Sequence, residues 1–148
     1  MAIYHFSVSH ISRSTGCSAV QNAAYITGEK FHEERRGITA NYSNRDDVCY
    51  AETLAPEWAG DEFRNTEKAW NLLENYEDKY DLERYKTPET QNKYMQSART
   101  AMKLVLALPK ELSEEQNKEL ALSFANKAYV SNGHVVTVAM HSDEGNPH

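Results

Sequence analysis

Residues 3–11 alternate apolar and polar side chains, in the order Ile-Tyr-His-Phe-Ser-Val-Ser-His-Ile. Because successive side chains of a β-strand point to opposite faces, this period of two predicts a strand with one buried face. Further strands are predicted at residues 50–55, 102–108 and 134–140, of which residues 102–108 are the most apolar. A proline follows each of the first two, and proline cannot donate the next ladder hydrogen bond. The chain is therefore predicted to contain four short strands.

Helical patterns separate these strands. Ser18 can accept a hydrogen bond from the first-turn amides of a helix over residues 19–25, and Gly28 suits the end of that helix. Residues 61–80 place an apolar stripe opposite a heavily charged face, which predicts a second helix. The sequence Ser-Glu-Glu-Gln at residues 113–116 has the form of a capping box, and apolar residues recur every four positions after it. A further helix is therefore predicted to follow.

The resulting order of strands and helices predicts a single α+β domain. Four strands with amphipathic helices on one side suit a two-layer sandwich, and the pattern leaves the strand directions open. A length of 148 residues fits one such domain. Residues 37–48 are expected to be irregular. The polar stretch 77–97, which Pro88 interrupts, is expected to be an insertion or linker that contains a short helix.

Composition argues against two classes of protein. No apolar run approaches the roughly 20 residues that a membrane-spanning helix needs, so no membrane segment is expected. The first residues lack the basic and apolar regions of a secretory signal. Cys17 and Cys49 show no CxxC spacing and are expected to be free thiols, which suits a reducing compartment. We therefore predict a cytoplasmic protein.

The net charge of −6 is unfavourable for a nucleic-acid partner, but this charge is unevenly distributed. Residues 1–45 contain five basic and three acidic side chains, whereas the remainder is strongly acidic. A local basic patch can bind a nucleic-acid strand even when the total charge is negative. Phosphate contacts are therefore expected from the N-terminal third, where the candidates are Arg13, Lys30, Arg35 and Arg36.

Tyr25 is the first candidate for chemistry, and two interpretations of it remain open. As one of nine tyrosines, it can be a core aromatic of the first helix. Alternatively, its phenoxide can attack phosphorus and form a covalent phosphotyrosine. Because a phenol is almost entirely un-ionised at neutral pH, a nearby cation, metal ion or base would have to assist that reaction.

His141 and His148 bracket a short polar segment after the last predicted strand. Gly145 and Pro147 can shape a tight turn that brings the two imidazoles together. Imidazole nitrogens bind divalent transition metals, but two of them make an incomplete site. A histidine at a strand end is usually a surface residue, so a metal site and an ordinary polar turn both remain open.

A set of short motifs runs through nearly the whole chain in a fixed order. They are Ala2-Ile-Tyr-His5, Ser12-Arg-Ser14, Gly16-x-Ser18-Ala19, Ala24-Tyr25, Tyr50-x-Glu52, Trp70-Asn71, Ala107-Leu-Pro-x-Glu111-Leu112, His141 and Asn146-Pro-His148. No single motif is decisive, but the ordered set resembles the MobA/MobL-type plasmid relaxases, the Q class of mobilisation proteins.

This resemblance implies the fold of the HUH endonucleases, in which a central, mainly antiparallel sheet with flanking helices carries a three-histidine metal site. That site faces a helix with the nucleophilic tyrosine, to which Tyr25 corresponds. His141 and His148 match the first two metal histidines. The family pattern continues Asn-Pro-His-x-His, so residues 1–148 are expected to be a single relaxase domain that is incomplete at its C-terminus.

The implied activity is strand-specific nicking of DNA at a plasmid origin of transfer, for conjugative mobilisation. Tyr25 would attack the scissile phosphate with the help of a divalent ion, Mn²⁺ or Mg²⁺, and form a 5′-phosphotyrosyl link. The implied partners are single-stranded or hairpin DNA, accessory mobilisation proteins and a coupling protein.

The match is incomplete, and other functions remain open. Many relatives carry a glutamate on the strand before Ala-Leu-Pro, where this chain has Lys103-Leu-Val-Leu106, so that acid or base is either absent or supplied by Glu52. Because the histidine set is incomplete, a fragment that binds origin DNA without cutting it is one rival. A rolling-circle replication initiator is another, although its tyrosine usually follows the histidines. A plain α+β interaction domain is the third.

Overall fold

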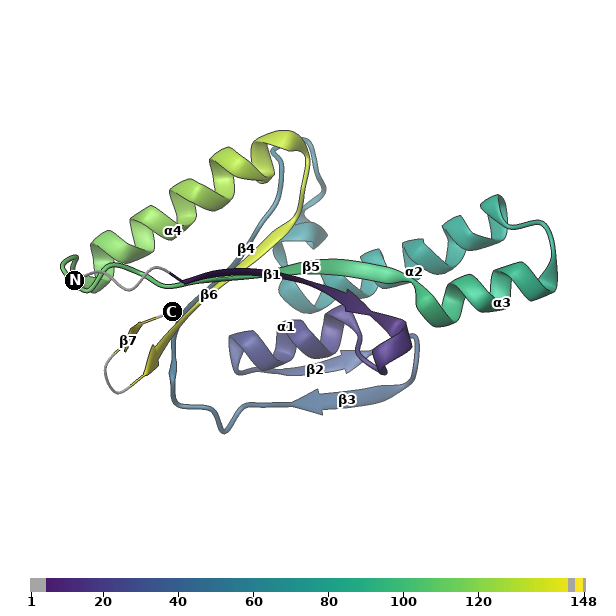
Figure 1. Ribbon diagram of the computed structural model, residues 1–148, viewed down its shortest axis with the longest axis horizontal. Helices are drawn as coiled ribbons and strands as arrows, with labels where there is room; N and C mark the ends of the chain where they lie inside the picture. The colour runs from purple at the N-terminus through teal and green to yellow at the C-terminus, as the bar shows by residue number, and fades with distance from the viewer. Residues whose placement is uncertain (1–4, 144–145, 148) are drawn as a thin grey trace.

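Every strand pair in the described part of the chain is antiparallel. The structure is a computed structural model that describes residues 5–143 and 146–147 (Figure 1). β1 (Phe6–Ser12) pairs with β5 (Arg99–Leu106), β2 (Lys30–Glu33) with β3 (Ile38–Asn41), and β6 (Val136–Asp143) with both β4 (Val48–Leu54) and β7 (Asn146–Pro147). The predicted α+β class with antiparallel strands is confirmed. The hydrogen bonds divide these strands into three sheets, where the resemblance implies one central sheet.

Helices connect the strands. The α-helices of the described ranges are α1 (Ala19–Thr27), α2 (Thr66–Arg84), α3 (Pro88–Ser97) and α4 (Glu114–Ala128). The short 3-10 helices are η1 (Arg13–Thr15), η2 (Asp61–Arg64) and η3 (Val130–Asn132). α2 and α3 form a hairpin whose far end projects from the rest of the molecule (Figure 1). None of the helices in these ranges has an apolar stretch long enough to cross a membrane.

Helices cover β4 and β6 on both faces. Trp70 of α2 donates a hydrogen bond from Nε1 to the Thr137 hydroxyl of β6 at 2.8 Å. The ammonium of Lys118 on α4 lies 4.4 Å from the ring centroid of Tyr50, which pairs with Met140. Positions 137 and 140 point to opposite faces because side chains alternate along a strand. The expectation that the helices lie on one side is therefore wrong, since α4 covers the face opposite α2.

Helix α1 begins and ends where the sequence predicts. The Ser18 hydroxyl accepts a hydrogen bond from the Gln21 amide at 3.0 Å, and Gly28 ends the helix with a φ of +65°. The small side chains of α1 pack against the β2–β3 hairpin. The resulting core cluster consists of Val20, Ala23, Ala24, Phe31 and Ala40. This packing fixes the position of the helix that carries Tyr25.

The β2–β3 hairpin was not predicted. Residues 37–48, which were expected to be irregular, contain β3. Each strand is only four residues long, and five of their eight side chains are polar or charged, so the alternation is too short to predict strands. The hairpin forms because Phe31 and Ala40 are paired across it and both are buried against α1. Tertiary packing here outweighs a weak local preference.

The stretch 77–97, predicted as an insertion or linker with a short helix, is mostly helical. Helix α2 continues to Arg84, and α3 begins at Pro88. Proline suits the first position of a helix because the N–H that it lacks would have no partner within the helix at that position. Thr87 caps α3 by accepting a hydrogen bond from the Thr90 amide at 3.2 Å. Pro88, which interrupts the polar stretch in the sequence, thus starts the predicted short helix.

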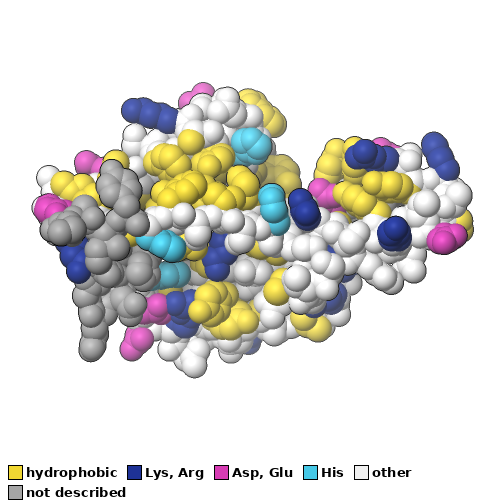
Figure 2. Space-filling view, viewed as in Figure 1, with side chains coloured by type: hydrophobic (Ala, Val, Ile, Leu, Met, Phe, Trp, Pro, Cys, Tyr) yellow, Lys and Arg dark blue, Asp and Glu magenta, His cyan; other side chains and the backbone are white. Residues whose placement is uncertain are grey.

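Apolar side chains gather between α4 and β1 (Figure 2). Helix α4 has the predicted capping box at Ser113. Its apolar stripe is only partly covered, since Leu120 and Phe124 are 45% and 40% exposed. On the neighbouring strand β1, Phe6 and Val8 are 59% and 48% exposed. Part of the period-two pattern that predicts β1 therefore faces solvent in this structure.

Candidate active site

Tyr25 lies near the end of α1 and is 44% exposed. Its ring meets the edge of the Tyr42 ring, with centroids 5.3 Å apart and planes at 89°. This edge-to-face contact orients the ring while almost half of the residue remains accessible. Tyr25 is therefore not a core aromatic.

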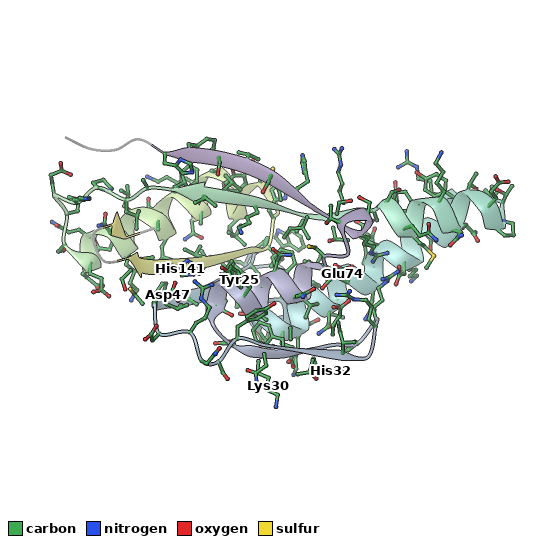
Figure 3. All side chains as sticks on the ribbon, turned by 60° about the horizontal axis from the view of Figure 1, so that its bottom comes forward. Tyr25, Lys30, His32, Asp47, Glu74 and His141 are labelled. Carbon is green, nitrogen blue, oxygen red and sulfur yellow. The ribbon has the colours of Figure 1, made fainter. Side chains whose placement is uncertain are left out.

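His141 of β6 lies against the same end of α1. Its Nε2 donates a hydrogen bond to the carbonyl oxygen of Ile26 at 2.6 Å, across 115 positions of sequence. Because a carbonyl oxygen only accepts, this contact places a proton on Nε2 and leaves Nδ1 of a neutral imidazole with its lone pair. Figure 3 shows Tyr25, Asp47 and His141 together at this end of α1. The structure thus brings together two of the predicted site residues, Tyr25 and His141.

Arg45 holds Tyr25 from the loop before β4. The guanidinium carbon of Arg45 lies 4.3 Å from the centroid of the Tyr25 ring, a distance typical of a cation–π contact. Its Nη1 donates to the carbonyl oxygen of Tyr25 at 2.8 Å. Its Nε donates to Asp47 Oδ1 at 2.8 Å, and its Nη2 donates to the second oxygen of the same carboxylate. Asp47 therefore fixes the plane of the guanidinium that lies over the ring.

The Arg45–Asp47 pair stays ionised over a wide pH range. The hydrogen bonds to Asp47 raise the pKa of Arg45, with smaller contributions from the Tyr25 phenol. The same hydrogen bonds, together with the charge of Arg45, hold the pKa of Asp47 below its ordinary value. In the sequence, Arg45 stands out only as one of the five basic side chains of the N-terminal third. No periodicity or motif links it to Tyr25, which lies 20 positions earlier.

Lys103 of β5 adds a second cation beside Tyr25. Its Nζ lies 5.9 Å from the centroid of the Tyr25 ring. Lys103 lies opposite Ser9 of β1, on the strand segment 103–106 where the resemblance implies a glutamate. At this position the chain therefore presents positive rather than negative charge to the tyrosine.

Glu52 lies on the other face of β4 from this cluster. It pairs with Val138, whereas His141 lies on the opposite face of β6. Its carboxylate accepts a hydrogen bond from the Tyr50 hydroxyl. Burial and the neighbouring Glu52 raise the pKa of Tyr50 to about 12. The structure thus does not bring Glu52, the predicted acid or base, to Tyr25.

Arg13, a predicted DNA contact, is buried in an ion-pair network. Its side chain is 5% exposed and donates to Glu74 at 2.7 Å and to Asp78 at 2.6 Å. The other oxygen of Glu74 accepts from the Ala19 amide at 2.7 Å, at the first turn of α1. Arg13 and Glu74 therefore join α2 to the start of the helix that carries Tyr25, and this guanidinium is occupied by carboxylates.

The other predicted DNA contacts are also placed away from Tyr25 or paired with acids. Arg35 donates to Asp78 at 2.9 Å. Arg36 forms a bidentate pair with the buried Glu33, at 2.6 and 2.7 Å. Lys30 is exposed on β2, and its label lies on the far side of α1 from Tyr25 in Figure 3. The structure does not join these four residues into one basic groove beside the tyrosine.

The Glu33–Arg36 pair predicts acid sensitivity of the fold. Burial raises the pKa of Glu33, but hydrogen bonds from Arg36 and Ser18 outweigh burial, so the pKa lies below its ordinary value of 4.5. Ionised Glu33 therefore stabilises the fold above about pH 4.5, and this contribution is lost as the pH falls through the lowered pKa. We expect the urea midpoint to fall more between about pH 5 and about pH 3 in wild type than in Glu33→Gln. Equal pH dependence in the two proteins would contradict this assignment.

The predicted metal site is only partly covered by the structure. His148 lies outside the described residues. Within 5–143 and 146–147, no group of three or more histidine, cysteine, aspartate or glutamate side chains is arranged to hold a metal ion. Cys17 and Cys49 are free thiols, as predicted, and both are exposed. Of the predicted metal ligands, His141 alone has a described position, beside Tyr25.

Comparison with known proteins decides the family. Residues 17–148 match the model of the MobA/MobL family. The chain belongs to the MobA/MobL family. The resemblance that the sequence motifs indicate is therefore confirmed for most of the chain, including the segments that carry Tyr25, Arg45 and His141.

The relatives include mobilization proteins and a conjugal transfer protein, in agreement with the family. A probable mobilization protein MobA from Bifidobacterium longum is 36% identical over the whole chain, which spans 24% of that protein. A conjugal transfer protein TraA from Agrobacterium fabrum is 32% identical, and the chain spans 13% of its length. A mobilization protein MobL from Acidithiobacillus ferridurans is 31% identical over 96% of the chain, which spans 32% of that relative. The chain thus spans about a third or less of these proteins.

A solved structure supports the fold. The structure comes from work on the molecular basis of vancomycin resistance transfer in Staphylococcus aureus. It superposes with a TM-score of 0.82 at 26% identity, over 99% of this chain and 66% of the other. The arrangement of helices and strands around α1 is therefore shared with a protein of known structure.

Proposed function

We propose that this MobA/MobL chain provides a relaxase domain that nicks one DNA strand at a plasmid origin of transfer. The observation that supports this proposal best is the exposed Tyr25 at the end of α1, where the His141 imidazole is hydrogen-bonded to the carbonyl oxygen of the next residue, Ile26. A nucleophile must be reachable by a polymeric substrate, and a 44% exposed tyrosine at a helix end meets that condition.

The proposed reaction exchanges one phosphate ester for another. The Tyr25 oxygen attacks the scissile phosphorus and a new oxygen–phosphorus bond forms. The bond from phosphorus to the 3′ oxygen breaks, the phenol loses its proton and the 3′ oxygen gains one. The products are a 5′-phosphotyrosyl strand and a free 3′-hydroxyl. Because the ester bond is conserved, the strand can be rejoined by the reverse reaction.

A divalent ion, Mn²⁺ or Mg²⁺, is part of this proposal. His141 and His148 would hold it, together with at least one further ligand. When bound, such an ion supplies positive charge at the phosphate oxygens. The hydrogen bond from His141 Nε2 to Ile26 orients the imidazole and leaves Nδ1 as the nitrogen that can bind a metal. The proposed metal site uses no other contact of the described residues.

The proposed substrate is single-stranded or hairpin DNA at the origin of transfer. Accessory mobilisation proteins and a coupling protein are the proposed partners. The rival function is origin binding without cleavage. Covalent capture of DNA by the protein distinguishes the two functions. A rolling-circle initiator would carry out related chemistry at a replication origin, so the origin that is cut identifies that rival.

The test is covalent capture of DNA. Single-stranded oligonucleotides tiled across the DNA that flanks the gene, with a label at the 3′ end, are incubated with the protein and Mn²⁺ or Mg²⁺. One oligonucleotide is expected to yield a labelled adduct that survives denaturation, and peptide mapping is expected to place it on Tyr25. Removal of the divalent ion with EDTA is expected to reduce the adduct to background, and added Mn²⁺ is expected to restore it.

Two results would contradict the proposal. Specific binding without an adduct under any divalent ion would support the rival that binds origin DNA without cutting it. An adduct that forms equally well after EDTA treatment would show that the reaction needs no divalent ion.

A further inference from the structure

Two cations converge on the one tyrosine that the proposed reaction uses. The Arg45 guanidinium lies 4.3 Å and the Lys103 ammonium 5.9 Å from the centroid of the Tyr25 ring. They come from unrelated elements, the loop before β4 and the middle of β5. In a chain with a net charge of −6, such a pair beside a single exposed phenol is not explained by composition.

The charges at this position do not cancel. Asp47 neutralises Arg45 through two hydrogen bonds. Lys103 makes no ion pair with any residue in the described ranges. By contrast, Arg13, Arg35 and Arg36 are all paired with carboxylates. The cluster of Arg45, Asp47 and Lys103 therefore carries one uncompensated positive charge next to Tyr25, which suits one singly charged phosphodiester.

We infer that Lys103 contacts a phosphodiester of the DNA strand beside Tyr25, while Arg45 fixes the position of the tyrosine ring. This inference rests on the proposed nicking function, and it names residues that the family resemblance does not supply. It also gives a role to Lys103, which lies on the strand segment 103–106 where the resemblance implies a glutamate.

The two cations have different tasks because their contacts differ. Arg45 uses Nε and Nη2 on Asp47 and one hydrogen of Nη1 on the Tyr25 carbonyl oxygen. Such a planar fork, held at three points, restrains the ring and the backbone of the tyrosine together. Arg45 is therefore a positioning residue. The ammonium of Lys103 is a compact charge on a flexible stem, which suits contact with a phosphate whose position is set by the rest of the strand.

The binding test measures how affinity depends on salt. Anisotropy titrations measure binding of the full chain to the oligonucleotide that forms the adduct. They are made at several salt concentrations, and no divalent ion is added. Each phosphate contact to a single strand contributes about 0.7 to the slope of log affinity against log salt. Lys103→Gln is expected to reduce the slope by about 0.7, and Lys103→Arg is expected to restore it. Lys127→Gln is the matched control, because this exposed lysine lies in the last turn of α4.

The rate test separates positioning from charge. Arg45→Lys keeps the charge but loses the fork, so the salt slope is expected to be unchanged. The single-turnover rate of adduct formation is expected to fall about ten- to hundredfold. A displacement of the nucleophile by about 1 Å is enough to lower a reaction rate by this factor. Thermal unfolding of the variant is measured alongside, and the comparison is made at a temperature where both proteins are folded. An unchanged rate would overturn the role of Arg45.

The failure of this inference is distinct from the failure of the proposed function. If wild type forms no adduct with any oligonucleotide, the nicking function itself is contradicted. If wild type forms the adduct, but the salt slopes of Lys103→Gln and Lys127→Gln both equal that of wild type, the phosphate-binding role of Lys103 is overturned while nicking stands.

Discussion

Substitution of Tyr25 by phenylalanine is expected to lower the single-turnover nicking rate by at least about 10³-fold, because the nucleophilic oxygen is lost. The ring remains, and with it the edge contact to Tyr42 and the cation–π contact to Arg45. The affinity for the origin oligonucleotide is therefore expected to change by less than about twofold. The measurements are gel quantification of the covalent adduct and anisotropy binding of the same oligonucleotide.

Tyr42→Phe is the matched control, because Tyr42 is in ring contact with Tyr25 and carries a hydroxyl of its own. It removes that hydroxyl while keeping the aromatic packing, and adduct formation is expected to persist. An adduct that survives in Tyr25→Phe and disappears in Tyr42→Phe would assign the nucleophile to the neighbouring tyrosine. Loss of DNA binding in Tyr25→Phe would show that the hydroxyl serves recognition as well as chemistry.

Replacement of Glu74 by alanine is expected to lower the free energy of unfolding by about 3–5 kcal/mol. The Glu74 side chain is 1% exposed and is hydrogen-bonded to Arg13, itself 5% exposed, and to the Ala19 amide. Its removal leaves a buried guanidinium with only Asp78 as an ionic partner and leaves a first-turn amide of α1 unpaired. Urea unfolding followed by circular dichroism measures the change.

The stability of Glu74→Ala is compared with that of two further variants on α2. Glu83→Ala removes an exposed carboxylate from the same helix and is expected to change stability by less than about 0.5 kcal/mol. Glu74→Gln keeps the shape and an acceptor oxygen but loses the charge, so its destabilisation is expected to fall between the other two. If Glu74→Ala is no less stable than Glu83→Ala, the buried network does not hold α1 against α2.

The parts of the fold that were predictable depend on short-range chemistry. Ser18 and Gly28 mark the ends of α1 because capping uses residues within one turn. Ser113 begins α4 for the same reason. The β2–β3 hairpin was missed because its buried side chains, Phe31 and Ala40, gain their stability from α1 and show no pattern of their own.

Only the residues of the candidate site that belong to a family motif could be predicted from the sequence. The structure places the two predicted residues Tyr25 and His141 at the same end of α1, and their roles stay predictions. Arg45 was missed because its link to Tyr25 is a side-chain contact made by a loop, which no periodicity encodes. Net charge in the N-terminal third also could not show that Arg13 is buried against Glu74, since composition does not report pairing.

The contacts that Arg45 and His141 make with the backbone have an electrostatic consequence. The last turn of an α-helix presents carbonyl oxygens with partial negative charge, which repel an approaching anion. In α1 the carbonyl of Ala24 accepts from the Gly28 and Glu29 amides, that of Tyr25 from Arg45, and that of Ile26 from His141. The negative pole of the helix is thereby covered by donors from distant parts of the chain. A tyrosine at a helix C-terminus, ordinarily a poor place for a polyanion, thus lies in surroundings that a phosphate can enter.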